Sequence, residues 1–148
     1  MFKTFNKIIK SNQGMSLIEI LIALTLLSLA GTFVVGRVYE SFQKGKIDTT
    51  KIQIKSLSDR LKEFRRDCNF FPDSNMGLDA LIQAPQGGRE CKSYSPGGYI
   101  DGSNIPKDPW EAEYIYESDG KTFTIMSYGA DNAEGGEGVD ADIKSSDL

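Results

Sequence analysis

Histidine is absent from this chain of 148 residues. It is the commonest general base in enzymes and the commonest ligand of transition metals, so its absence removes the usual catalytic sets. Ser16, Ser127 and Ser145 have no histidine to activate them, and no glycine-rich loop follows a strand in a phosphate-binding context. The chain also lacks a block of basic residues and has a formal net charge of −4. We expect neither an enzyme nor a protein that binds nucleic acid.

Cysteine is nearly as scarce, with Cys68 and Cys91 as the two examples. Both follow an apolar N-terminal segment that would place them outside the cytoplasm, where pairing is the ordinary outcome. One disulfide closing a loop of about 24 residues would stabilise the fold by roughly 3 kcal/mol on the chain-entropy estimate. The alternative is two free thiols or a metal pair, for which no further cysteine or histidine exists to complete a zinc site.

An uncharged run extends from Met15 to Val35 except for one glutamate, Glu19. About 20 apolar residues suffice to cross a bilayer as a helix. The residues before this run carry three lysines and no acidic residue, and positive charge beside a span favours the cytoplasmic side. The sequence therefore predicts a single membrane span with a cytoplasmic N-terminus and the remainder of the chain on the far side.

The position of the small residue Gly14, before the apolar run, distinguishes this segment from an ordinary secretory signal. Such signals are cleaved after the apolar core, whereas cleavage at Gly14 would leave the apolar helix on the mature protein. The order of Gly14, Met15 and Glu19 resembles the class III signal of type IV pilins and type II secretion pseudopilins. The resemblance implies cleavage after Gly14 by a prepilin peptidase and N-methylation of Met15, where the family usually has phenylalanine.

A carboxylate inside a membrane span requires an explanation. A charged Glu19 alone in lipid would cost several kcal/mol, so it needs a partner or must be protonated. Cleavage after Gly14 would create an α-amine on Met15 about one helical turn away, and the same amine could face Glu19 of a neighbouring copy. We therefore expect Glu19 to set the axial register between copies in a filament. The alternative is a polar residue that is tolerated near the membrane interface.

The helical pattern continues beyond the membrane run. Apolar residues from Ile47 to Phe64 recur at helical intervals of 7, 3, 4 and 3. One helix is predicted from about Ser16 to Arg65, apolar all round in its first half and amphipathic in its second. Glycines at 31, 36 and 45 are weak points, where the helix could kink or unwind in a packed filament. The amphipathic stripe is explained most simply by contact with the chain's own folded part.

The remaining elements are predicted to be short. The segment Asn75–Gln83 favours a second helix, and the Gly-, Pro- and Ser-rich segment 84–98 favours a loop. Two β-type runs, Tyr114–Glu117 and Lys121–Ser127, flank a turn and indicate a hairpin. A short strand near Tyr99-Ile100 would make the sheet three-stranded.

The C-terminal segment Asp131–Asp142 contains five carboxylates among several glycines. Carboxylates this close repel one another unless a hard cation such as Ca²⁺ neutralises them. The spacing is not that of an EF-hand, because Ala133 and Gly135 stand where ligands belong. From composition alone, a solvated acidic loop is the simpler interpretation.

Motifs along most of the chain occur in the order typical of the major pseudopilins of type II secretion, a family that the chain resembles. They are the leader with Glu19, Phe71-Pro72 before Gly77-Leu78-x-Ala80-Leu81, Gly97-Gly98-Tyr99-Ile100, Asp108-Pro109-Trp110, and the ending Gly-Gly-Glu-Gly-x-Asp-Ala-Asp-Ile. The resemblance implies a calcium site made of the side chains of Asp131, Asp140 and Asp142 and of main-chain oxygens near Tyr128 and Val139.

Two features depart from the family pattern. Glu111 stands where glycine usually follows Asp-Pro-Trp, and the pair of cysteines is not typical of the family. Neither touches the proposed metal loop. The motif Asp108-Pro109-Trp110 itself is interpreted as a packed turn rather than as the site of a catalytic aspartate.

The sequence thus predicts an α+β pilin-like fold, in which a long N-terminal α-helix, transmembrane and then amphipathic, packs on a small antiparallel β-sheet with a C-terminal calcium loop. The expected parts are a cleaved leader at residues 1–14, a transmembrane and assembly helix at 15–36, and a periplasmic globular domain at 37–148. The resemblance implies a subunit that is held in the inner membrane and then polymerises into a periplasmic pseudopilus, which drives folded exoproteins through the outer membrane.

The expected partners follow from the same resemblance. They are further copies of the chain, minor pseudopilins, an inner-membrane assembly platform, prepilin peptidase and, indirectly, the outer-membrane secretin channel. One alternative is a structural subunit of a surface type IV pilus, which would serve adhesion, motility or DNA uptake. The other is a membrane-anchored periplasmic enzyme.

Overall fold

The computed structural model describes residues 15–148, apart from the side chains of residues 32–34. The predicted leader, including the cleavage residue Gly14, lies outside the described residues. The chain divides into two compact units, the first ending at Glu40 and the second extending from Ser41 to Leu148.

The helix α1 (Leu17–Cys68) is 52 residues long and accounts for the described part of the first unit and the start of the second. Its bounds lie within three residues of the sequence prediction, and it is unbroken at the three glycines that were its expected weak points. The helix ends where Asn69 adopts a positive φ of 64°, the left-handed conformation that commonly closes a helix. Arg65 and Arg66 lie in the last turn, where positive charge favours the helix dipole.

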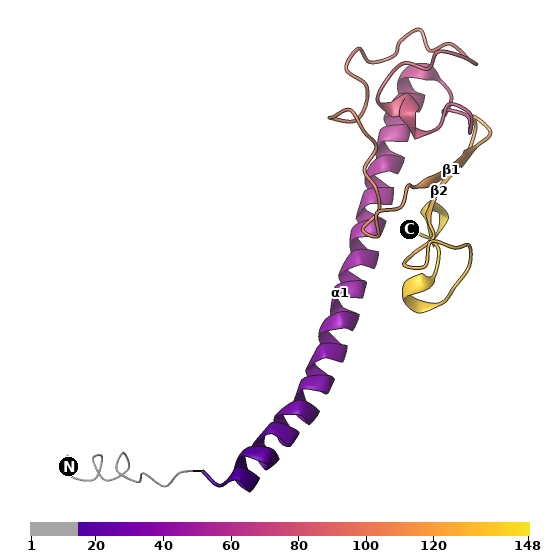
Figure 1. Cartoon of the computed structure of the whole chain (residues 1–148). Coiled ribbons are helices and arrows are strands. Elements are labelled where there is room, and N and C mark those ends of the chain that lie inside the picture. The colour runs from indigo at the N-terminus through magenta and orange to yellow at the C-terminus, as the bar shows by residue number, and fades with distance from the viewer. Residues whose placement is uncertain (1–14) are drawn as a thin grey trace, which may run out of the picture. The chain divides into compact units, whose positions relative to one another are not determined.

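In the first unit, all described side chains from Met15 to Glu40 are exposed. Leu17, Leu27 and Val35 are 77%, 70% and 69% exposed. By length and composition this part of α1 (indigo in Figure 1) is apolar enough to cross a membrane. Its apolar surface has no cover within its own unit, so the unit is complete only in lipid or against other helices.

The second unit contains a three-stranded antiparallel sheet in the order β1-β2-β3. β1 (Ile115–Ser118) and β2 (Phe123–Ser127) form the hairpin that the sequence predicts, and Ser118 pairs with Phe123 next to the turn. The Asp119 carboxylate accepts the backbone N–H groups of Lys121 and Thr122 at 2.9 and 2.7 Å. These bonds hold the turn and keep the pKa of Asp119 below its usual range, with the Thr122 N–H the largest cause.

The third strand is not where the sequence places it. β3 (Ile143–Lys144) comes from the C-terminal end and pairs with β2. The prediction of a strand at Tyr99-Ile100 was wrong, because the Tyr99 N–H donates to the carbonyl of Leu81 at 2.7 Å rather than to a strand. Gly98 makes this approach possible: a Cβ there would lie 2.9 Å from the Leu81 carbonyl oxygen.

The core of the second unit lies along one face of α1, beside the hairpin (Figure 1). Ile54, Leu61 and Phe64 are fully buried there, as the helical spacing predicts. Ile125 of β2 and Ile143 of β3 join the same apolar cluster. The other buried members are Leu57, Cys68, Phe70, Phe71, Leu78, Ala80, Leu81, Tyr99 and Tyr114.

The predicted helix at Asn75–Gln83 is reduced to the 3₁₀ turn η2 (Leu78–Leu81). A turn begins at Asp73, whose carboxylate accepts the N–H groups of Asn75 and Met76 at 3.0 and 2.9 Å. Gly77 interrupts it, because its φ of 63° and ψ of −168° lie outside the helical region. The short turn still buries three apolar side chains against the core.

The segment that follows α1 is fixed by a disulfide and by buried tyrosines. Cys68, the last residue of α1, is bonded to Cys91, which ties the loop 84–98 to the helix end. The Tyr99 hydroxyl donates to the Asp67 carboxylate at 3.1 Å. The Tyr116 hydroxyl of β1 donates to the carbonyl of Pro72 at 2.7 Å, and burial, followed by the Asp73 charge, raises the pKa of Tyr116 to about 12.

Candidate functional site

The first candidate site is the N-terminus of α1, where Glu19 lies in the first turn. The Glu19 carboxylate accepts the Ser16 backbone N–H at 3.4 Å. The Ser16 carbonyl in turn accepts the N–H groups of Glu19 and Ile20 at 2.9 and 3.2 Å. Glu19 thus reaches back over the helix end, in the manner of the acidic residue of a capping box. The pattern Ser16-x-x-Glu19 is a signal for this contact in the sequence.

This geometry places a carboxylate at the positive end of the helix dipole, next to Met15. An anion is favoured at that end, because the first N–H groups of a helix have no partner within the helix. An α-amine created at Met15 would stand one residue before Ser16, whose N–H Glu19 already accepts. The pairing of that amine with Glu19, in the same copy or a neighbouring one, stays a prediction.

The second candidate site is the C-terminal loop between β2 and β3, which contains the 3₁₀ turn η3 (Gly138–Asp140). The loop folds back on itself through backbone contacts: the Ala130 N–H donates to the Val139 carbonyl at 3.1 Å, and the Asp142 N–H donates to the Gly135 carbonyl at 3.2 Å. The Gly135 N–H returns a bond of 3.0 Å to the Asp142 carboxylate. These hydrogen bonds hold the two arms of the loop together.

Glycine is required where the two arms of this loop meet. Gly136 has a φ of 78°, and a Cβ there would collide with the backbone carbonyl of Asp140. Gly129 has a φ of 67°, and a Cβ there would lie 2.9 Å from the Val139 carbonyl oxygen. Side chains other than hydrogen are excluded at both positions. The absence of a side chain lets the backbones of the two arms come this close.

The predicted calcium ligands fit a hard cation in donor type but are not gathered around one point. Asp131 accepts the Ala133 N–H at 3.1 Å, and Asp142 lies 3.6 Å from the Lys144 ammonium. Within residues 15–148, no three acidic, cysteine or histidine side chains converge as a metal cluster. To hold a cation the carboxylates would have to converge on one point, and the Asp131 side chain is exposed. Tyr128 and Val139 are half-buried at the base of the loop.

Asp108 lies in a packed turn. Its side chain is buried, with one carboxylate oxygen accepting the N–H groups of Trp110 and Ala112 at 3.0 and 2.8 Å. The other oxygen accepts the Ser127 hydroxyl at 2.6 Å, and the Trp110 indole N–H donates to Gln43 of α1 at 3.3 Å. The link to Ser127 could not be read from the sequence, because it joins residues 19 positions apart. The turn fastens the sheet to the helix.

Two family models match two consecutive segments of this chain. The model of type II secretion system protein G matches residues 37–146, and the model of the prokaryotic N-terminal methylation motif matches residues 9–35. The matched ranges, the long helix and the small antiparallel sheet together define a class: a pilin-like structural subunit with an N-terminal methylation motif.

Individual relatives agree with this class. The type II secretion system core protein G of Vibrio cholerae is 33% identical over 139 residues, 93% of each chain. That of Xanthomonas campestris is 35% identical over 133 residues, 88% of this chain and 87% of its own. The crystal structure of the major pseudopilin from the type 2 secretion system of enterohaemorrhagic Escherichia coli matches with a TM-score of 0.62 and 27% identity, covering 73% of this chain and 92% of that one.

The chain belongs to the type II secretion system protein G family. It is therefore a structural pseudopilin subunit rather than an enzyme, and the alternative of a surface type IV pilus subunit is not favoured. Membership implies assembly into a pseudopilus with other components of the secretion system. The methylation motif and the long apolar helix indicate membrane anchoring.

Proposed function

We propose that the chain is cleaved after Gly14 by a prepilin peptidase, methylated at Met15 and polymerised into a periplasmic pseudopilus that drives folded exoproteins through the outer membrane. The observation that carries this proposal is the exposed apolar first part of α1, whose N-terminal end is capped by Glu19. A surface of this kind needs lipid before assembly and neighbouring helices after it. The second unit has its own core and is built to remain folded through that transfer.

The topology we propose is a single pass through the inner membrane with a cytoplasmic N-terminus and a periplasmic second unit. The three lysines before the apolar run support this orientation. The disulfide between Cys68 and Cys91 supports an oxidising compartment for the second unit. The partners would be further copies of the chain, minor pseudopilins, the inner-membrane assembly platform and, indirectly, the outer-membrane secretin channel.

Glu19 would direct the addition of each subunit. A carboxylate near the membrane-embedded end of one copy attracts the α-amine on Met15 of the next, and this attraction is strong where water is scarce. Held at its own helix end, the Glu19 side chain stays beside the backbone that would carry the new amine. Apolar contact alone allows helices to slide, whereas a charge pair fixes one axial register.

A deletion strain and its complement test the secretory function. The proteins of the culture supernatant would be compared, and surface filaments would be counted by electron microscopy. We expect specific exoproteins to disappear from the supernatant while surface pili remain, and the complement to restore them. Unchanged secretion with missing surface pili would instead favour a type IV pilus subunit.

We also propose that the C-terminal loop holds Ca²⁺ through the side chains of Asp131, Asp140 and Asp142 and the main-chain oxygens of Tyr128 and Val139. The support is the oxygen-only donor set and the fold-back of the loop at two obligatory glycines. The Val139 carbonyl accepts one bond from the Ala130 N–H and has a second lone pair. Bound calcium would supply positive charge that offsets the repulsion among the carboxylates.

Thermal unfolding of the full chain in detergent, with calcium or with a chelator, tests this site. A ligand at about 100 times its Kd stabilises a protein by about 2.7 kcal/mol, so we expect calcium to raise the Tm of the wild type. Asp140→Ala should abolish the response. Glu137→Ala removes the same charge from an exposed position that is not a proposed ligand, and it should keep the response. An equal response of wild type and Asp140→Ala would refute the site.

A further inference from the structure

One face of the second half of α1 carries a line of cations. Lys44, Lys51, Lys55, Lys62 and Arg66 are spaced by 7, 4, 7 and 4 residues, which places them on one side of a helix with 3.6 residues per turn. All five are exposed, and none belongs to the apolar face that packs on the core. We call these five residues the basic stripe. It is roughly 33 Å long, at 1.5 Å per residue.

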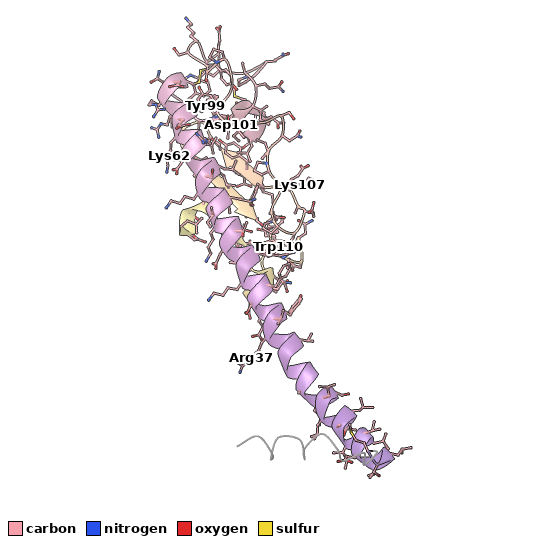
Figure 2. All side chains as sticks on the ribbon, turned by 90° about the vertical axis from the view of Figure 1, so that its left-hand side faces the viewer. Arg37, Lys62, Tyr99, Asp101, Lys107 and Trp110 are labelled. Carbon is pink, nitrogen blue, oxygen red and sulfur yellow. A yellow bond between two sulfur atoms is a disulfide. The ribbon has the colours of Figure 1, made fainter. Side chains whose placement is uncertain are left out.

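The basic stripe has more positive charge than its surroundings neutralise. Residues 44–66 contain eight cationic and three acidic side chains, a net charge of +5. Figure 2 shows Lys62 on one side of α1, with Lys107 and Trp110 on the other side. The Lys62 ammonium pairs with the Asp59 carboxylate at 2.9 Å. The other four stripe cations make one further ion pair among the described residues, from Arg66 to Asp67 at 3.8 Å.

The C-terminal loop carries the complementary charge. Residues 131–142 contain five carboxylates and no cation, a net charge of −5. Residues 131–138 are all exposed, and Glu134 and Glu137 make none of the ion pairs found among the described residues. One bound calcium ion would leave a net charge of −3, so the loop remains acidic with or without the metal.

We propose that the basic stripe is the docking face for the acidic C-terminal loop of a second copy of this chain. The inference deepens the proposed function, because it rests on the polymerisation of copies into a filament. No ion pair among residues 15–148 joins the stripe to the loop of the same copy. Each copy therefore offers one face of each sign, and a head-to-tail contact between such faces repeats along a helical array.

The contact would act on orientation and register more than on total affinity. Opposite charges steer two surfaces together and make wrong alignments costly by placing like charges against one another. The apolar half of α1 supplies no such selectivity, because aliphatic side chains pack in many registers. Glu134 and Glu137 are the loop residues we assign to the contact, and Lys51 and Lys55 are the matching stripe residues.

Charge reversal on each face, and then on both, tests the proposal in cells that lack the wild-type chain. The variants are Lys51→Glu with Lys55→Glu, Glu134→Lys with Glu137→Lys, and all four changes together, each in the full chain. Sheared filaments and membrane-inserted subunit would both be measured by immunoblot. We expect each one-sided reversal to lower the filament yield about tenfold at unchanged membrane level, and the fourfold variant to recover to within about twofold of wild type.

A matched control is Lys92→Glu with Lys121→Glu, which reverses two exposed lysines outside the stripe and should leave the yield unchanged. A fourfold variant as defective as either one-sided reversal would overturn the proposal, and the stripe would then belong to another anionic surface such as lipid headgroups. Normal yield from both one-sided reversals would also overturn it. Absence of filaments from the wild type itself would refute the proposed function as well, so the two failures are distinct.

Covalent trapping gives a second measurement that does not depend on charge. Both native cysteines are joined in one disulfide, so an added pair reports a new contact. Lys55→Cys combined with Glu134→Cys should form a ladder of covalent multimers in assembled filaments under mild oxidation. Lys92→Cys combined with Glu134→Cys should form none. Equal ladders from the two pairs, or no ladder from the first, would contradict the assigned contact.

Discussion

The two parts of α1 are one continuous helix in two different environments. From Met15 to Glu40 all described side chains are exposed, although most are apolar. From Ser41 to Cys68 the helix buries one face in a core completed by the sheet and the connecting segments. The second part therefore packs the core of one copy with its apolar face, whereas the first part has an apolar surface that only lipid or other helices can cover.

The largest expected effect comes from the same truncation made in each part. Leu61 is fully buried, so Leu61→Ala should lower the free energy of unfolding of the second unit by about 3 kcal/mol. Leu27 is 70% exposed, so Leu27→Ala should leave that free energy unchanged. Denaturant unfolding of the full chain in detergent, followed by far-UV circular dichroism, measures both. Equal destabilisation by the two variants would remove the distinction between the parts.

An intermediate effect is expected from Tyr116, the partly buried tyrosine on β1. Burial raises the pKa of Tyr116 in the folded state to about 12, from the ordinary value of 10.0 for tyrosine. A raised pKa in the folded state means that stability is fully present below pH 10 and falls as the pH rises from 10 to 12. Thermal unfolding of the wild type at a series of pH values should show this decline.

Tyr116→Phe is the matched variant for that series. It removes the hydroxyl that donates to the Pro72 carbonyl, so it should cost about 1 kcal/mol below pH 10. Its stability should then decline less steeply than that of the wild type above pH 10, since one of the titrating groups is gone. Parallel curves for the two proteins would show that Tyr116 does not contribute to the alkaline decline.

The smallest effect is expected at Glu111, which has a φ of 71°. A left-handed backbone conformation costs a non-glycine residue about 1 to 2 kcal/mol, and glycine avoids this cost. Part of the gain is offset because glycine makes the unfolded state more flexible. We expect Glu111→Gly to raise the stability of the second unit by about 0.5 kcal/mol, measured as a small increase in Tm. A decrease in Tm would mean that the Glu111 side chain stabilises the turn.

The elements that the sequence predicts correctly are those with a local signal. The 3- and 4-residue spacing from Ile47 to Phe64 predicts the buried face of α1, and two β-type runs around Ser118-Asp119-Gly120 predict the hairpin. β3 has two residues and no alternating pattern, and its pairing with β2 spans the acidic loop. Long-range contacts of this kind leave no periodicity to detect.

The candidate sites also differ in whether the sequence carries a local signal for them. The cap between Glu19 and Ser16 has a local signal, the four-residue pattern Ser16-x-x-Glu19. The packing of Gly129 and Gly136 against carbonyls of the opposite arm cannot be predicted from the sequence, because a glycine does not indicate which backbone segment lies against it. Likewise, the sequence does not say that Gly77 adopts a positive φ, which limits the predicted helix to η2.

The most direct test of the difference between the two parts of α1 is the behaviour of Glu19→Ala in cells that lack the wild-type chain. Membrane fractionation would measure the inserted subunit, and electron microscopy with immunoblotting of sheared material would measure filaments. We predict normal insertion, a second unit with unchanged thermal stability, and no filaments. Filaments as abundant as those of the wild type would contradict the claim that the first part of α1 assembles copies through Glu19.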